Sequence, residues 1–200
     1  SFSFAAPGTG DPSAKPPPVK NKRTFSTLSG FDLRTGPLAK SDFFIELKER
    51  ANIANRNRAD LFVSIHCNAT GTPSVHGTET YVMGSKNFGA NFDIVKRENA
   101  VILLEEDYEE NYEGFDPQSP ESYMMFNLMQ KAYFSNSLSL AQKIENDFVT
   151  RLNRSSRGVK QAPFYVLWTT SMPSVLIETG FLIRRESGWK LLNGQTSFVK

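Results

Sequence analysis

The stretch ADLFVSIHCNAT, Ala59 to Thr70, is a run of apolar and β-branched residues that ends on a histidine, His66. Such a run predicts a buried strand of the kind found inside parallel sheets, with His66 at its carboxyl end. Ligands of open α/β sheets bind at that end, because the crevices open there. The stretch therefore predicts an α/β fold and makes His66 the first candidate site residue.

Length and composition fit one globular domain, since the 200 residues are 39% hydrophobic and 12% aromatic. A balance of 23 basic against 21 acidic residues, without a basic stripe, argues against nucleic acid as a partner. No run approaches the roughly 20 apolar residues of a membrane span, and the start, SFSFAAPG, lacks the features of a secretory signal. The single cysteine, Cys67, excludes an internal disulfide.

Helical and extended patterns alternate along the chain. Helical spacing of apolar residues predicts a helix over 46–58 and, over 119–151, either one long helix or two joined near Ser135–Ser137, and 88–104 is a further helix candidate. Extended, apolar patterns run over 78–84, 162–170 and 173–181. The basic segment NRSSRGVKQ, residues 153–161, is predicted to be a loop. Helices that alternate with buried strands predict a three-layer α/β fold.

Two segments depart from this alternation. Residues 1–40 include the run KPPP and show no periodicity, so we expect an irregular or disordered segment there. The stretch EEDYEENYEGFDPQSP is strongly acidic and ends in Pro and Gly, which predicts an exposed acidic insertion at about 99–120. One folded unit is therefore expected over 41–200.

His66 ends one predicted strand and Glu178 lies near the end of another. If these strands are neighbours, both side chains meet at one rim of the sheet. An imidazole that binds zinc and a glutamate that takes a proton from metal-bound water suit a zinc hydrolase. A hydrogen-bonded histidine and a salt-bridged glutamate of purely structural role are the alternative. Cys67 is expected to pack in the core on the opposite face, and His76 to lie in an exposed loop.

Several ordered blocks resemble those of the zinc-dependent N-acetylmuramoyl-L-alanine amidases, the type 3 cell-wall amidase family. They cover about residues 40–187 and include RANIANRNRADLFVSIHCNA, GTETYVMG, RGVKQAPFYVLW and MPSVLIETGF. The resemblance implies an α/β fold with a mainly parallel, twisted sheet flanked by helices. It also implies that residues 41–200 are an incomplete amidase catalytic domain.

The implied activity is hydrolysis of the amide bond between N-acetylmuramic acid and L-alanine in bacterial peptidoglycan, in the periplasm or at the cell surface. Within the family pattern, His66 matches the zinc ligand of the SIHxN block and Glu178 matches the catalytic glutamate of ExGF. The resemblance therefore implies Zn2+ as cofactor and Glu178 as general base for a zinc-activated water.

The resemblance weakens toward both ends of the chain. Thr9 and Asn21 stand where the family has its first zinc histidine and its zinc glutamate, and neither is a usual zinc ligand. We therefore expect a degenerate N-terminus, and a C-terminus truncated before the family's closing helix. The alternative function is a catalytically inactive relative or fragment that acts at most as a peptidoglycan-binding module.

The acidic insertion raises a question of regulation. In some relatives, a helix inserted at about this point covers the zinc site and an activator protein moves it aside. The resemblance makes Glu98, Glu105 or Glu106 the candidate plugging carboxylate and an activator protein a candidate partner. The alternative is a solvated acidic face.

Overall fold

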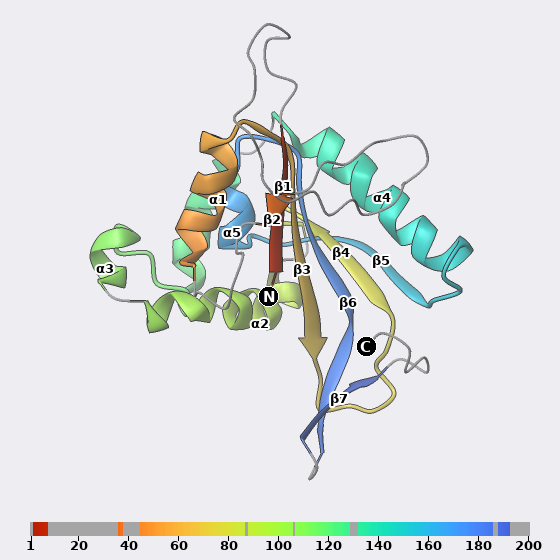
Figure 1. The fold of residues 1–200 in the computed structure, drawn as a ribbon. Helices are drawn as coiled ribbons and strands as arrows, with labels where there is room; N and C mark the ends of the chain where they lie inside the picture. Colours follow the sequence, from red (N-terminus) through yellow and green to blue (C-terminus); the bar gives the residue numbers. More distant parts are fainter. Residues whose placement is uncertain are drawn as a thin grey trace, which may run out of the picture.

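The computed structural model describes residues 2–7, 36–37, 45–86, 88–105, 107–128, 132–185 and 188–192. Within these residues, a twisted seven-stranded sheet has the order β2-β1-β3-β6-β4-β5, and β7 pairs with β6 outside this path (Figure 1). The strands are β1 (Phe2–Pro7), β2 (Gly36–Pro37), β3 (Ala59–Ala69), β4 (Thr78–Val82), β5 (Ser156–Gln161), β6 (Ser174–Arg185) and β7 (Gly188–Leu192).

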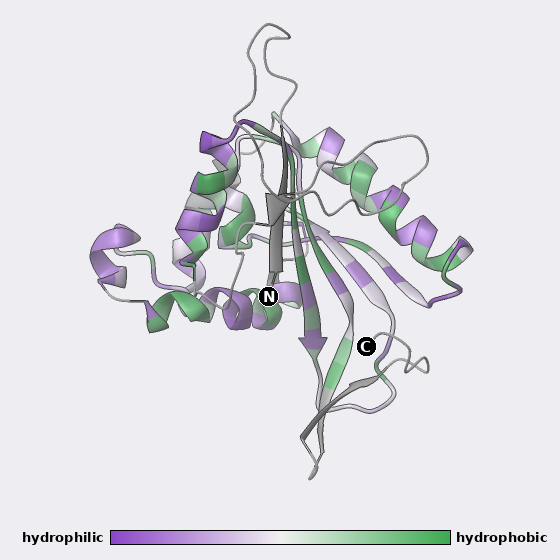
Figure 2. Cartoon of the chain, viewed as in Figure 1, coloured by the Kyte–Doolittle hydropathy of each residue, from purple (hydrophilic) through white to green (hydrophobic). Residues whose placement is uncertain are grey.

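Helices cover both faces of the sheet (Figure 1). Among the described residues, the helices are α1 (Leu47–Arg56), α2 (Phe88–Asn99), α3 (Tyr108–Asn111), α4 (Phe134–Thr150) and α5 (Tyr165–Trp168), with two 3-10 helices, η1 (Ala100–Leu104) and η2 (Pro120–Leu128). Figure 2 shows hydrophilic and hydrophobic residues interspersed along α1 and α4, as expected of helices with one covered face.

Successive residues of β6 enter two separate cores. Leu176 packs with α1, α2 and α5, whereas Val175 and Ile177 pack against α4. This alternation follows from the two-residue period of a strand, and it divides the protein into three layers. The expected three-layer α/β fold is therefore confirmed.

The direction of the strands is more mixed than the mainly parallel sheet that was expected. The pairs β3/β6 and β4/β5 are parallel, whereas β4/β6, β1/β3, β1/β2 and β6/β7 are antiparallel. The connection between β3 and β4, residues 70–77, is too short for the crossover that a parallel arrangement requires. Strand β4 therefore returns antiparallel on the far side of β6.

The helices and strands predicted from sequence were confirmed where apolar residues recur with a helical or extended period. They were wrong at two segments without such a period. The helix over 46–58 and the strands over 59–70, 78–84 and 173–181 are present as α1, β3, β4 and β6. The loop predicted over 153–161 contains the edge strand β5, and the strand predicted over 162–170 is instead a loop with the short helix α5. Burial of Phe164, Tyr165 and Leu167 explains the apolar run at α5 without a strand.

The first 40 residues also hold regular structure that was not expected. Strand β1 pairs antiparallel with β3 from Phe2 to Pro7, and β2 pairs with β1. The rest of this segment, including Thr9 and Asn21, lies outside the described residues.

Glu145 fastens α4 to the sheet. Its side chain is buried, and its carboxylate oxygens accept hydrogen bonds from the hydroxyls of Thr78 (2.9 Å), Thr80 (2.5 Å) and Ser156. A buried carboxylate is tolerated only when such donors satisfy it. Glu145 therefore ties α4 to β4 and β5 at one point.

Replacing Glu145 with Ala should lower the free energy of unfolding by about 2–4 kcal/mol, because two buried hydroxyls and one half-buried hydroxyl lose their acceptor. Urea unfolding followed by circular dichroism measures the change. Asp147→Ala is the matched control on the same helix, since its pair with Arg151 is partly exposed and should contribute less than about 1 kcal/mol. Equal losses in the two variants would contradict this role of Glu145.

Candidate functional site

The parallel pairing of β3 with β6 places His66 directly beside Glu178. Residues in register on neighbouring strands project from the same face of a sheet, here the face that α1, α2 and α5 cover. Ser64, two residues before His66, shares this face, and its Oγ lies 2.9 Å from His66 Nε2. The two residues singled out in the sequence therefore meet on one face of the sheet.

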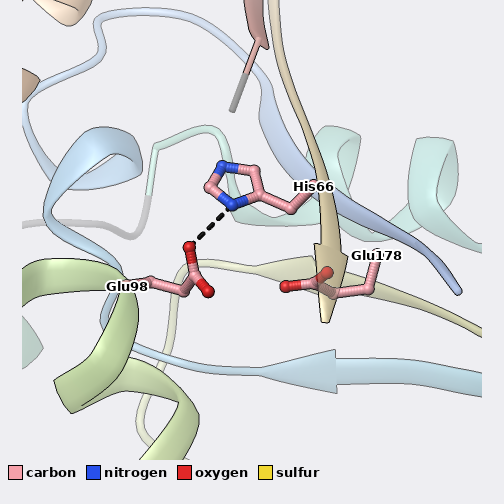
Figure 3. A group of neighbouring side chains, drawn as sticks. All are labelled: His66, Glu98 and Glu178. Atoms are coloured by element: carbon pink, nitrogen blue, oxygen red, sulfur yellow. Dashed lines mark hydrogen bonds and ion pairs between the residues drawn. The ribbon is translucent and has the colours of Figure 1, made fainter. Parts of the chain in front are cut away.

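The third member of the cluster comes from α2. Glu98 Oε2 lies 2.7 Å from His66 Nδ1, and Figure 3 shows the Glu98 side chain reaching from the helix toward the histidine, with Glu178 beside both. Arg97 Nη2 donates a hydrogen bond of 2.5 Å to Asn68 Oδ1, which fixes the end of α2 against β3. One ligand atom from each of His66, Glu98 and Glu178 lies within 4.8 Å of the others.

Glu178 is the most unusual group of this cluster. Its side chain is 0% exposed, and neither carboxylate oxygen has a hydrogen-bond partner among the described residues. Burial, together with the negative charges of Glu98 and Glu79, raises the pKa of Glu178 to about 8, although the positive charge of Arg97 opposes the rise. The carboxyl group is therefore largely protonated at pH 7 when no further cation is near.

Glu98 is shifted in the opposite direction. Burial alone would raise its pKa, but the hydrogen bond and charge of His66, with the charge of Arg97, hold the pKa of Glu98 below its usual range. Two neighbouring carboxyl groups thus have pKa values that are driven apart. This pattern is typical of acid and base groups in active sites, although ion-pair networks also produce it.

The cluster fits a zinc ion in its donor atoms and in its electrostatics. Zinc in catalytic sites is held by imidazole nitrogen and carboxylate oxygen, commonly from three protein side chains. A buried carboxylate without a donor is costly unless a proton or a cation compensates it. The two unpartnered oxygens of Glu178 are therefore the observation that favours a cation beside His66 and Glu98.

Glu105 does not lie in this cluster, so the hypothesis that it plugs the site is wrong. Its Oε1 accepts a hydrogen bond of 3.0 Å from the backbone N–H of Leu47, at the start of α1, and its other oxygen accepts one from the Tyr112 hydroxyl. Glu105 therefore caps α1, where an acceptor satisfies a free backbone amide. Glu106 lies outside the described residues.

The two other residues weighed from sequence lie away from the cluster. Cys67 is exposed and contacts Thr179, so the expected core packing is wrong. His76 is exposed in the loop before β4, as expected, and its Nδ1 lies 2.9 Å from the Ser74 carbonyl oxygen.

Two residues near the cluster were missed in the sequence. Ser64 had a visible signal, because it lies two residues before His66 in the same strand. Glu79 had a weaker one, as a carboxylate inside the extended pattern TETYV.

Comparisons with known proteins place the chain in a family. A family model described as N-acetylmuramoyl-L-alanine amidase matches residues 34–197. The N-acetylmuramoyl-L-alanine amidase AmiA of Escherichia coli K12 is 33% identical over 173 residues, which are 84% of this chain and 56% of AmiA. The uncharacterized protein YqiI of Bacillus subtilis is 33% identical over 150 residues, 75% of this chain and 50% of YqiI. The chain thus spans about half the length of the curated relatives that it matches.

Among solved structures, the N-acetylmuramoyl-L-alanine amidase of Clostridium difficile 630 has a TM-score of 0.46 at 25% identity. The match covers 72% of this chain and 53% of that one.

Replacing Glu178 with Gln should stabilise the metal-free chain at pH 8 and leave it nearly unchanged at pH 5. The native pKa of Glu178 lies above its unfolded value, so its contribution to stability is full below about pH 4.5 and is lost as the pH rises toward 8. The predicted gain at pH 8 is roughly 3–5 kcal/mol, from 1.36 kcal/mol for each pKa unit.

Thermal and urea unfolding with a chelator at both pH values measure this difference. Asp93→Asn, an exposed change on α2, controls for the loss of one negative charge. A Glu178→Gln variant that is less stable than the parent chain at pH 8 would contradict the prediction.

Proposed function

Because the chain belongs to the N-acetylmuramoyl-L-alanine amidase family, we propose that it hydrolyses the amide bond between N-acetylmuramic acid and L-alanine in peptidoglycan. The observation that supports this proposal is the close grouping of His66, Glu98 and the unpartnered, buried Glu178. Peptidoglycan surrounds bacterial cells, so we propose a place of action in the periplasm or at the cell surface. Among the described residues, no helix is both long and apolar enough to cross a membrane.

In this proposal, His66 is a ligand of Zn2+ and Glu178 is the catalytic base. Zinc, when bound, polarises the amide carbonyl and lowers the pKa of a water molecule. Glu178 would accept a proton from the attacking water on a carboxylate oxygen as the water oxygen bonds to the amide carbon, and would return that proton to the amine nitrogen as the C–N bond breaks. Glu178 is ionised for this role when positive charge lies beside it, because an adjacent opposite charge lowers a carboxyl pKa.

The surroundings of His66 and Glu178 support these two roles. Ser64, at Nε2 of His66, would hold the ring so that Nδ1 faces the two carboxylates. The complete burial of Glu178 keeps bulk water from the proton that it transfers.

Glu98 supports a second part of the proposal, which concerns regulation. Its carboxylate lies 2.7 Å from His66 Nδ1, in a position that competes with water and substrate at the site. The helix that carries it, α2, leads directly into the acidic segment 99–120. We therefore propose Glu98 as the plugging carboxylate, and a protein that moves α2 as a candidate activator.

Elemental analysis of the dialysed 200-residue chain should find about one zinc per chain, and His66→Ala should reduce it to background. His76→Ala is the matched control, because His76 is exposed and lies outside the cluster. Zinc near background in the parent chain would instead support a catalytically inactive relative that acts at most as a peptidoglycan-binding module.

Glu178→Gln should slow release of the peptide from an N-acetylmuramoyl peptide by about 10²–10⁴-fold, the usual contribution of a general acid or base. Its zinc content should stay above that of His66→Ala. Hydrolysis at the parent rate by Glu178→Gln would exclude this residue as the base.

Glu98→Gln should raise the rate of hydrolysis several-fold in the absence of other proteins, because a neutral amide competes less well for a cation than a carboxylate does. Glu110→Gln, an exposed change on α3, is the matched control. A Glu98→Gln variant with less zinc and a lower rate would show that Glu98 is a required ligand and not a plug.

A further inference from the structure

A second charged cluster lies beside Glu178, on the side away from His66. Glu79 of β4 is in register with Glu178 of β6, so both side chains project from the same face of the sheet. Glu79 is 2% exposed, and its Oε1 accepts hydrogen bonds from Arg157 Nε (2.5 Å) and Lys160 Nζ (2.6 Å). Its Oε2 accepts one of 2.6 Å from the Tyr81 hydroxyl.

A β-bulge in β5 brings the two cations together. Two pairs, Thr78 with Ser156 and Thr80 with Val159, enclose one more residue on β5 than on β4, and Gly158 within the bulge has φ +82°. Residues three apart in a regular strand point to opposite faces. The bulge therefore turns Arg157 to the face of Lys160, and bulges next to active sites commonly redirect side chains in this way.

The cluster carries two positive charges, on Arg157 and Lys160, against the one negative charge of Glu79. The hydrogen bonds from Lys160, Tyr81 and Arg157 outweigh the effect of burial and hold the pKa of Glu79 below its usual range, so it is ionised. One cation would balance this carboxylate, but two contact it. The Arg157 side chain is 41% exposed and that of Lys160 is 27% exposed, so both present charge to solvent beside the buried Glu178.

We propose that Arg157 and Lys160 form a subsite for a carboxylate on the peptide part of the substrate. This inference rests on the proposed function, in which the bond at His66 and Glu178 is cleaved. Strand β5 lies two strands beyond β6, which is about 10 Å at the usual strand spacing. An extended chain covers about 3.3–3.6 Å per residue, so this span is roughly two residues of backbone plus the reach of an acidic side chain on the second residue.

The chemistry of the pair fits such a group. A guanidinium and an ammonium bind carboxylates by charge-assisted hydrogen bonds, and the planar fork of arginine can contact both oxygens. The Arg157 guanidinium lies 5.4 Å from the Phe181 ring centroid, which keeps it against the sheet as a preformed contact. The pair therefore selects a peptide that carries negative charge near the cleaved bond.

The test uses an L-alanyl dipeptide whose second residue is glutamic acid, and its dimethyl ester, as ligands of the full chain with zinc. Neither contains the scissile amide, so binding can be followed by NMR titration without turnover. The acid should bind about tenfold more tightly than the ester, in line with hydrogen bonds to charged groups. Arg157→Gln and Lys160→Gln should each remove most of this preference and leave ester binding unchanged.

Two further variants keep the test decisive if Lys160→Gln folds poorly. Arg157→Lys retains the charge and should retain the preference for the acid, whereas Glu79→Gln removes the internal competitor and should increase it. Arg56→Gln, in an exposed pair on α1, is the matched control and should change nothing.

Equal binding of the acid and the ester would overturn the proposed subsite. An unchanged preference for the acid in both Arg157→Gln and Lys160→Gln would also overturn it. If hydrolysis of an N-acetylmuramoyl peptide persists in that case, the proposed function stands without the subsite. A chain that binds neither dipeptide and hydrolyses no N-acetylmuramoyl peptide would overturn both.

Discussion

The register of β3 against β6 is the constraint on which the candidate site depends. A slip of one residue would send His66 or Glu178 to the face that α4 covers. The apolar alternation of β6 prevents it, because Leu176 must enter one core while Val175 and Ile177 enter the other. The apolar residues of β6 that form the two cores therefore also align His66 with Glu178, and no further interaction is required to bring these two side chains together.

Charged groups on this face are compensated to different degrees. Glu79 has two cations and a hydroxyl, and Glu98 has His66 with Arg97 nearby, but the oxygens of Glu178 have no donor among the residues described. A fold selected for stability alone would give Glu178 a partner or replace it with an apolar residue. Destabilised polar groups that persist in a core are typical of functional sites, where activity offsets their cost in stability.

Sequence reasoning succeeded where local pattern determines structure. Apolar periodicity marked β3 and β6, and a polar residue within each run marked His66 and Glu178. It failed at residues 153–170, because β5 is a polar edge strand defined by its pairing with β4, and α5 is apolar but short. The role of Glu105 was also invisible, since the amide that it caps lies 58 residues away. Long-range pairing of this kind leaves no signal in a single sequence.

The two sides of Glu178 differ in charge, and this difference favours one orientation of the substrate in the proposed reaction. On the α2 side, Glu98 places a carboxylate against His66, whereas on the β5 side two cations outnumber the one carboxylate of Glu79. Arg97 balances the charge of Glu98 on the α2 side, whereas the extra cation on the β5 side attracts an anionic peptide. In the proposed reaction the peptide would extend across β4 toward β5, and the uncharged sugar would lie toward α2. Because Glu98 occupies that side of the site, α2 would have to move when the sugar binds.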